Sequence, residues 1–187
     1  MQRKSSNLSK TKMITTMALL VAMSVAIGWA CKTYLTLPIG AIRVTFENLP
    51  VILSGILYGP IVGAVVALIS DTISCLISPN PALNLIIMLG AASIGIISGI
   101  ISRYLFNGSK TLKVIFSVFL SHIVGSMIIK SIGLHVVWKY PFSVLVFRIP
   151  IYIAIAAIES IVILAILQNS RLSVMLERQI KTKRGTK

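Results

Sequence analysis

The 187-residue sequence has few acidic residues, cysteines and histidines. It contains four Asp and Glu residues, two Cys and two His, against 18 Lys and Arg. Four carboxylates, one of which is Glu177 near the C-terminus, are too few for the clustered acids of a membrane phosphotransferase. No Walker loop, H-x-x-x-H or H-E-x-x-H motif occurs. The sequence therefore predicts neither an enzyme nor a metal site.

Charge of either sign is scarce as well. Only 12% of the residues are charged, about half the share of a soluble domain, and 56% are hydrophobic, with a mean hydropathy of +0.95. A helix needs roughly 20 apolar residues to cross a membrane. The chain is therefore expected to be an all-α membrane protein. Its runs without Asp, Glu, Lys or Arg are 13–31, 48–70, 72–102, 114–129 and 149–158.

Proline and glycine divide these runs. "YGP" at 58–60 and "SPNPAL" at 78–83 are typical of turns, because proline fixes φ and glycine tolerates positive φ. The first run has an alternative interpretation as a cleaved signal sequence ending in "GWAC", but it is long for a signal core, and Trp29 stands where small residues are needed. Cys31 and Cys75 have no metal-site spacing and are expected to pack as small apolar residues. We predict six transmembrane helices near 12–31, 44–58, 60–78, 83–106, 112–134 and 143–168.

Basic residues predict the orientation through the positive-inside rule. Thirteen of the 18 Lys and Arg precede the first helix, lie between the fourth and fifth helices, or follow from Arg171 onward. Both termini are therefore expected to be cytoplasmic. We divide the chain into a basic N-terminus (1–11), a six-helix domain (12–168) and a basic amphipathic tail (169–187). The tail suits anionic lipid better than the alternative, a nucleic-acid-binding arm.

Five basic residues break this rule, because the topology places them at the outer side: Lys32, Arg43, Lys130, Lys139 and Arg148. Lysines at such positions often reach headgroups, and this is the alternative for Lys32 and Lys139. Arg148 lies inside the last helix, where an arginine is costly, so it is expected to face the protein interior.

Polar and small residues form helical stripes. Small residues usually mark helix packing, but Asp71, Asn84, Lys130 and Arg148 lie near the outer ends and predict an outward-facing polar pocket. Asp71 either contacts a ligand or pairs with one of the bases. The four stripes are Arg148, Tyr152 and Glu159; His122, Ser126, Lys130 and Gly133; Gly63, Ala67, Ser70, Asp71, Ser74 and Ser78; and Asn84, Met88, Ala91, Gly95 and Gly99.

Aromatic side chains near this pocket make it suitable for a flat anionic solute. They are Tyr34, Phe46, Trp138, Tyr140 and Tyr152.

Three segments carry a family resemblance. "MALLVAMSVAIG" (17–28), "IRVTFENLPVILSGILYGPIVGAVVALISDTI" (42–73) and "YPFSVLVFRIPIYIAIAAIE" (140–159) closely resemble the folate-type S components of energy-coupling-factor (ECF) vitamin transporters. The middle block is the most specific, and the resemblance covers nearly the whole chain. After "SPNPALN", the segment "LIIMLGAA" departs from the Phe-rich pattern of many folate-type members.

The resemblance implies a six-helix membrane subunit that captures folate or a related vitamin outside a bacterial plasma membrane. Its implied partners are a transmembrane coupling protein and two ATPase subunits. ATP is used by those partners, so no cofactor is expected on this chain. Alternatives are an S component for a different vitamin and a stand-alone small-solute carrier, which would need ionisable groups through the membrane.

The resemblance also gives roles to particular residues. Arg43 is expected to bind a ligand carboxylate and Glu47 an amino-amide edge, with an ordinary i to i+4 salt bridge between them as the alternative. Ala18, Ala22 and Ala26 form a seam at four-residue spacing, and Ala18 and Ala22 match the pair on the first helix that docks the coupling subunit; packing within the bundle is the alternative. The expected substrate-binding residues are Tyr34, Arg43, Phe46, Glu47, Asp71, Asn84, Lys130, Trp138, Arg148 and Tyr152.

Overall fold

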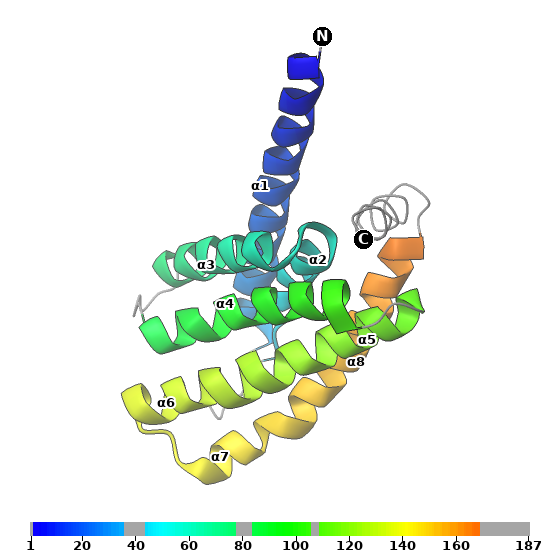
Figure 1. Cartoon of the computed structure of the whole chain (residues 1–187). Helices are drawn as coiled ribbons and strands as arrows, with labels where there is room; N and C mark the ends of the chain where they lie inside the picture. The colour runs from blue at the N-terminus through cyan, green and yellow to red at the C-terminus, as the bar shows by residue number, and fades with distance from the viewer. Residues whose placement is uncertain (1, 36–43, 78–83, 106–108, 169–187) are drawn as a thin grey trace.

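The computed structural model describes residues 2–35, 44–77, 84–105 and 109–168, and within these ranges every regular element is a helix (Figure 1). Arg43, Ser78 and the expected amphipathic tail lie outside the described residues. The helices are α1 (Gln2–Tyr34), α2 (Asn48–Tyr58), α3 (Pro60–Leu76), α4 (Leu85–Ile100), α5 (Lys110–Ser121), α6 (Lys130–Trp138), α7 (Phe142–Val146) and α8 (Arg148–Gln168). Two π-helical segments, η1 (Ile101–Leu105) and η2 (His122–Ile129), extend α4 and join α5 to α6.

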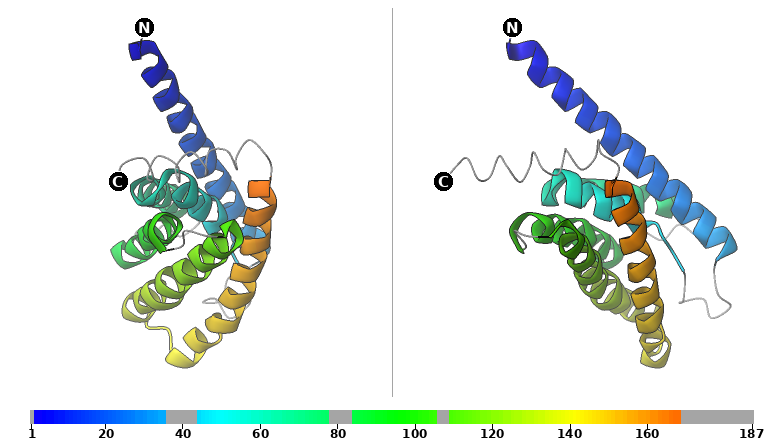
Figure 2. Two further views of the ribbon diagram at one scale, coloured as in Figure 1. Left: turned by 45° about the vertical axis from the view of Figure 1, so that its right-hand side comes forward. Right: turned by 90° about the vertical axis from the view of Figure 1, so that its right-hand side faces the viewer.

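The helices agree with the six predicted segments to within a few residues, with two differences. Helix α1 begins at Gln2 rather than near residue 12, and its N-terminal part extends beyond the other helices (Figures 1 and 2). The sixth segment is interrupted after Val146, and α8 restarts at Arg148. Pro150 is compatible with this restart because the first turn of a helix leaves its N–H groups without helical partners.

Four of the segments are long and apolar enough to cross a membrane: Met13–Tyr34, Leu85–Tyr104, Lys110–Trp138 and Phe142–Gln168. Helices α2 and α3 are apolar but shorter, with 11 and 17 residues. At 1.5 Å per residue, α2 is roughly half as long as the ~30 Å hydrocarbon core is thick. Large apolar side chains are exposed on the outer surface, Ile61 and Leu85 among them, as lipid contact requires.

Glycine and proline end α2 and begin α3. Gly59 has a φ of 99°, and Pro60 occupies the first turn of α3. The Arg103 guanidinium donates a 2.7 Å hydrogen bond to the Tyr58 carbonyl beside this turn. A side chain at Gly59 would collide with that guanidinium, so the turn needs glycine for both its conformation and its neighbour.

Helices α2, α3 and α4 pack closely through a glycine-lined contact, which we call the glycine contact. A Cβ atom on Gly95 would collide with the backbone of Gly63, and one on Gly99 with the backbone of the Gly59–Pro60 turn. Gly55 likewise packs against Gly95 and Ser98. Gly63, Gly95 and Gly99 belong to the predicted small-residue stripes, and close backbone approach is the reason such stripes pack helices in membranes.

Helix α8 packs against α5 and η2 on another side of the bundle (Figures 1 and 2). This contact, which we call the polar contact, contains ionisable side chains. His122 and Glu159 are fully buried there, and Arg148 is 5% exposed. The predicted stripe of Arg148, Tyr152 and Glu159 therefore faces the stripe that contains His122.

Candidate substrate-binding site

Four charged residues meet where α1 and α3 end and α6 begins. The Glu47 carboxylate lies 3.9 Å from Lys32 Nζ and 4.0 Å from Lys130 Nζ. Asp71 of α3 interacts electrostatically with Lys130, Glu47 and Lys32. The four residues therefore form one mutually compensated cluster, which we call the charged cluster.

Backbone contacts fix the position of Glu47 within this cluster. The Ser24 hydroxyl of α1 donates a 2.7 Å hydrogen bond to the Glu47 carbonyl. A Cβ atom on Gly28 would lie 2.6 Å from Glu47 Oε2, so the glycine gives the carboxylate its space against α1. Lys32 Nζ also donates to the Ser74 carbonyl at 3.5 Å. The residue before α2 is thus held against α1 and α3.

Arg148 approaches the charged cluster from α8. Its positive charge is close enough to Lys130 for the two to repel each other. Its guanidinium donates hydrogen bonds of 3.1 Å to the hydroxyls of Ser131 and Tyr152. Its Cζ atom lies 5.1 Å from the centroid of the Tyr152 ring. Within the described part of the chain, no carboxylate pairs with Arg148. The charged cluster and Arg148 together hold three bases and two acids, so this region carries a net positive charge.

Asn84 caps the N-terminus of α4, and only one of the two polar atoms of its side chain has a partner among the described residues. Its Oδ1 accepts a 2.9 Å hydrogen bond from the Ile86 N–H and caps the helix. Its Nδ2 is buried and has no hydrogen-bond partner among the described residues. A buried amide N–H without a partner is costly, so Asn84 has a donor available for a ligand.

The structure brings some of the sequence-predicted site residues together and places others apart from them. The structure brings together Glu47, Asp71, Lys130, Arg148 and Tyr152, and it places Asn84 at the start of α4. Phe46 is half-buried next to Glu47, whereas Tyr34 and Trp138 are 78% and 41% exposed at the ends of α1 and α6.

Lys32 and Ser131 were not predicted as site residues. Headgroup contact was the alternative for Lys32, yet this residue pairs with Glu47; a sequence pattern cannot pair two residues across the intervening loop. Ser131 lies nine residues after His122. In a regular α-helix of 3.6 residues per turn, such positions point roughly 180° apart, so an α-helical pattern places Ser131 on the wrong face. The π-helical segment η2 changes this phase.

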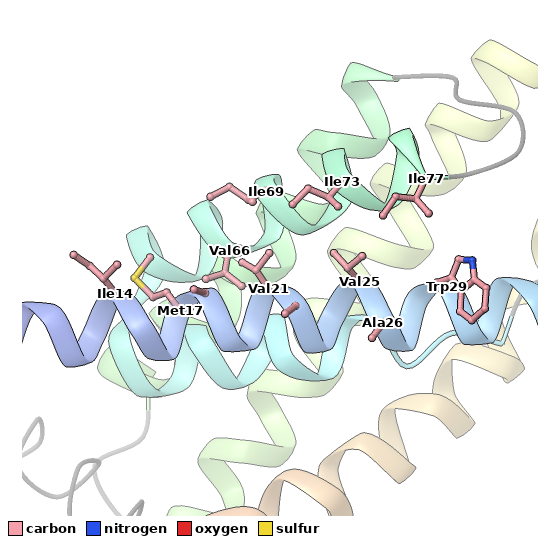
Figure 3. A pocket seen from close by; sticks show the side chains of 12 residues that line it. Ile14, Met17, Val21, Val25, Ala26, Trp29, Val66, Ile69, Ile73 and Ile77 are labelled. Carbon is pink, nitrogen blue, oxygen red and sulfur yellow. The ribbon is translucent and has the colours of Figure 1, made fainter.

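Helix α1 presents Ala18, Ala22 and Ala26 on its exposed surface. They line an apolar groove of about 750 Å³ between α1 and α3 (Figure 3), and none of the four residues of the charged cluster lines it. No charged side chain lines it. The remaining lining residues are Ile14, Met17, Val21, Val25, Trp29, Val66, Ile69, Ile73 and Ile77.

Residues 12–173 match the family model described as ECF transporter, substrate-specific component. The match covers most of the chain, so the protein belongs to this family and is a substrate-binding membrane subunit of an ECF transporter. Membership implies a small-molecule substrate and an energising module of coupling and ATPase subunits as partners. No curated protein matches the chain.

Proposed function

We propose that this S component captures folate, or a closely related vitamin, outside a bacterial cell for uptake driven by ATP hydrolysis in its partner subunits. Arg148 carries the proposal. It is buried, its two hydrogen-bond acceptors are neutral hydroxyls, and the described chain offers it no carboxylate. Leaving a buried charge without an opposite charge is unfavourable, and a ligand carboxylate would supply that charge through the planar guanidinium.

Neighbouring groups support a flat, polar ligand. Tyr152 offers an aromatic ring beside Arg148, and the Asn84 amide donor has no partner among the described residues. Glu47 and Asp71 supply acceptors of the kind that an amino-substituted heterocycle needs. A folate has both a carboxylate and such a heterocycle, which is why we prefer it to a vitamin that lacks one of them.

The distribution of basic residues supports the proposed orientation. Arg103, Lys110 and Lys113 lie around the connection from η1 to α5, whereas Lys130 begins α6 and Arg148 begins α8. With the first group and both termini in the cytoplasm, as the positive-inside rule favours, the charged cluster opens to the outside.

The test of the substrate is folate binding by the purified protein and its Arg148→Met variant. Removing the charge also removes an insertion penalty, so the variant should fold, while losing a charged hydrogen bond of about 1.5 to 3 kcal/mol. Its Kd should rise about tenfold or more. Equal affinity of a folded variant would reject Arg148 as a ligand-binding residue, and absence of binding to the unaltered protein would reject folate.

For the partner, we propose that the seam of Ala18, Ala22 and Ala26 receives a helix of the coupling subunit. Their exposure and small side chains support close approach of another helix. Ala22→Trp should abolish complex formation and uptake by the assembled transporter, while the isolated chain keeps its solute binding, because no residue of the charged cluster lines the groove and Ala22 lies ten residues, about 15 Å along α1, before Lys32.

Met23→Trp is a suitable control, because Met23 is exposed on α1 but does not line the groove. It should leave uptake intact. Normal uptake by Ala22→Trp, or unfolding of the isolated Ala22→Trp chain, would show that the seam is not the docking surface.

A further inference from the structure

The polar contact contains a buried acid-base pair that the binding site does not use directly. Nε2 of His122 lies 2.6 Å from Oε2 of Glu159, and both side chains are fully buried. Nδ1 of His122 lies 3.2 Å from the Ser126 hydroxyl. With one proton on Nδ1, donated to the Ser126 hydroxyl, and a second proton shared between Nε2 and Oε2, the pair is neutral overall and needs no further counter-ion.

Tyr152 connects this pair to Arg148. Its ring centroid lies 5.8 Å from that of His122, with the rings tilted by 37°, within the range of favourable aromatic pairs. Its hydroxyl accepts the hydrogen bond from Arg148. Arg148, Tyr152 and Glu159 all belong to α8, so a single helix carries the acid, the aromatic ring and the base.

The π-helical segment η2 makes this double attachment possible. His122, at its start, contacts Glu159, and Ser131, just after its end, accepts a hydrogen bond from Arg148. Both partners lie on α8, although a regular α-helix would point His122 and Ser131 in roughly opposite directions. The wider π-helical turns, often found at functional sites, bring both residues to the α8 side.

We propose that His122 and Glu159 are positioning residues for the substrate site. Their hydrogen bond clamps η2 to α8 and holds the Tyr152 ring, which in turn fixes the Arg148 guanidinium. The proposal rests on the proposed function of Arg148 in binding the substrate carboxylate. A purely structural pair would stabilise the bundle without acting on Arg148 through Tyr152.

A double-mutant cycle in folate binding distinguishes these two roles. The variants are Glu159→Leu, Tyr152→Phe and the double variant, with Ser160→Ala as control because the Ser160 hydroxyl donates to the Ala156 carbonyl of its own helix. Glu159→Leu should raise the Kd about tenfold, since it leaves His122 unpaired and Tyr152 unsupported. The double variant should bind no more weakly than the weaker single variant. The proposal would be overturned if the increases in Kd of the two single variants multiplied in the double variant. It would also be overturned if Glu159→Leu had the same Kd as Ser160→Ala.

Two amide variants, Glu159→Gln and Glu159→Asn, keep the proposal testable if Glu159→Leu does not fold. The glutamine carbonyl can still accept from His122 Nε2–H, so this variant should recover most of the affinity lost in Glu159→Leu. Where Glu159→Leu does not fold, Glu159→Asn takes its place, because the shorter side chain breaks the bond while keeping the amide. Equal affinities of the glutamine and asparagine variants would contradict a role for the hydrogen bond.

A second measurement does not require folate. The guanidinium ¹⁵N resonances of Arg148, assigned by their loss in Arg148→Met, should be resolved in the ligand-free protein and in Ser160→Ala. In Glu159→Leu and Tyr152→Phe the guanidinium group should rotate more freely, and this rotation should average its resonances. Resolved signals in Glu159→Leu would refute the positioning role. If the unaltered protein does not bind folate, the proposed substrate fails, and this measurement still decides the positioning role.

Discussion

The glycine contact and the polar contact join helices of the same bundle by different means. In the glycine contact, α2, α3 and α4 approach until backbone meets backbone, as at Gly63 and Gly95. In the polar contact, η2 meets α8 through side chains, with His122 on Glu159, and Ser131, just after η2, contacts Arg148 of the same helix. Lipid provides no hydrophobic force between helices, so both means are needed: close packing, and hydrogen bonds between side chains.

Because of this difference, we expect the glycine contact to determine the stability of the fold and the polar contact to determine ligand affinity. Backbone packing tolerates no added atoms, whereas a contact made of side chains can be altered by conservative substitution. The glycine contact contains no ionisable residue that could recognise an anion. The groups that could do so lie in the polar contact and in the adjoining charged cluster. We therefore expect substitutions in the first region to affect folding and substitutions in the second to affect affinity.

The largest effect is expected for Gly95→Val. A side chain at this position would collide with the Gly63 backbone, and backbone cannot move aside as a flexible side chain can. The added bulk should cost about 3 kcal/mol or more and eliminate most folded protein, as measured by size-exclusion chromatography of the detergent extract. Ile96→Val is the control, because Ile96 is 37% exposed on the same helix. A monodisperse Gly95→Val protein that binds normally would mean that the glycine contact is not tightly constrained.

A smaller effect, on affinity, is expected for Lys130→Gln. Lys130 is 8% exposed and interacts with both Asp71 and Glu47, so its loss removes the net positive charge of the region. Folate affinity should fall about tenfold, within the range for a buried charged contact. Lys139→Gln removes the same charge from an exposed position and should change the Kd by less than about twofold, because solvent and salt screen it. Equal effects of the two substitutions in calorimetric titrations would show that only overall charge matters.

Sequence patterns anticipated the helices better than the contacts between them. Pro60 and the prolines of "SPNPAL" located helix ends because proline acts on its own neighbours. The stripe of Arg148, Tyr152 and Glu159 was correctly expected to face inward, since a charge in lipid must find a protein interior. The partners of a stripe depend on helix pairing, however, and the pairing of Glu159 with His122 became visible only in the structure.

Two site features were beyond a periodicity argument. The π-helical phase of η2 leaves no signal in a 3.6-residue pattern, so Ser131 was missed. Lys32 carries the same local signal as Lys139, a base at a helix end, yet the first pairs with Glu47 and the second is exposed. Only the packing of α1 against the start of α2 separates them.

Lys32 gives the smallest expected effect, and it tests whether the charged cluster acts as a unit. Its Nζ atom lies 3.9 Å from Glu47 Oε2 and 3.5 Å from the Ser74 carbonyl, and its side chain is 26% exposed. Partly exposed pairs at such distances contribute about 0.2 to 1 kcal/mol, and Lys32→Gln leaves Glu47 paired with Lys130. Folate affinity should therefore change by no more than about threefold, and the difference should shrink as salt is raised. A tenfold, salt-independent loss in binding titrations would instead place Lys32 against the ligand and extend the binding site onto α1.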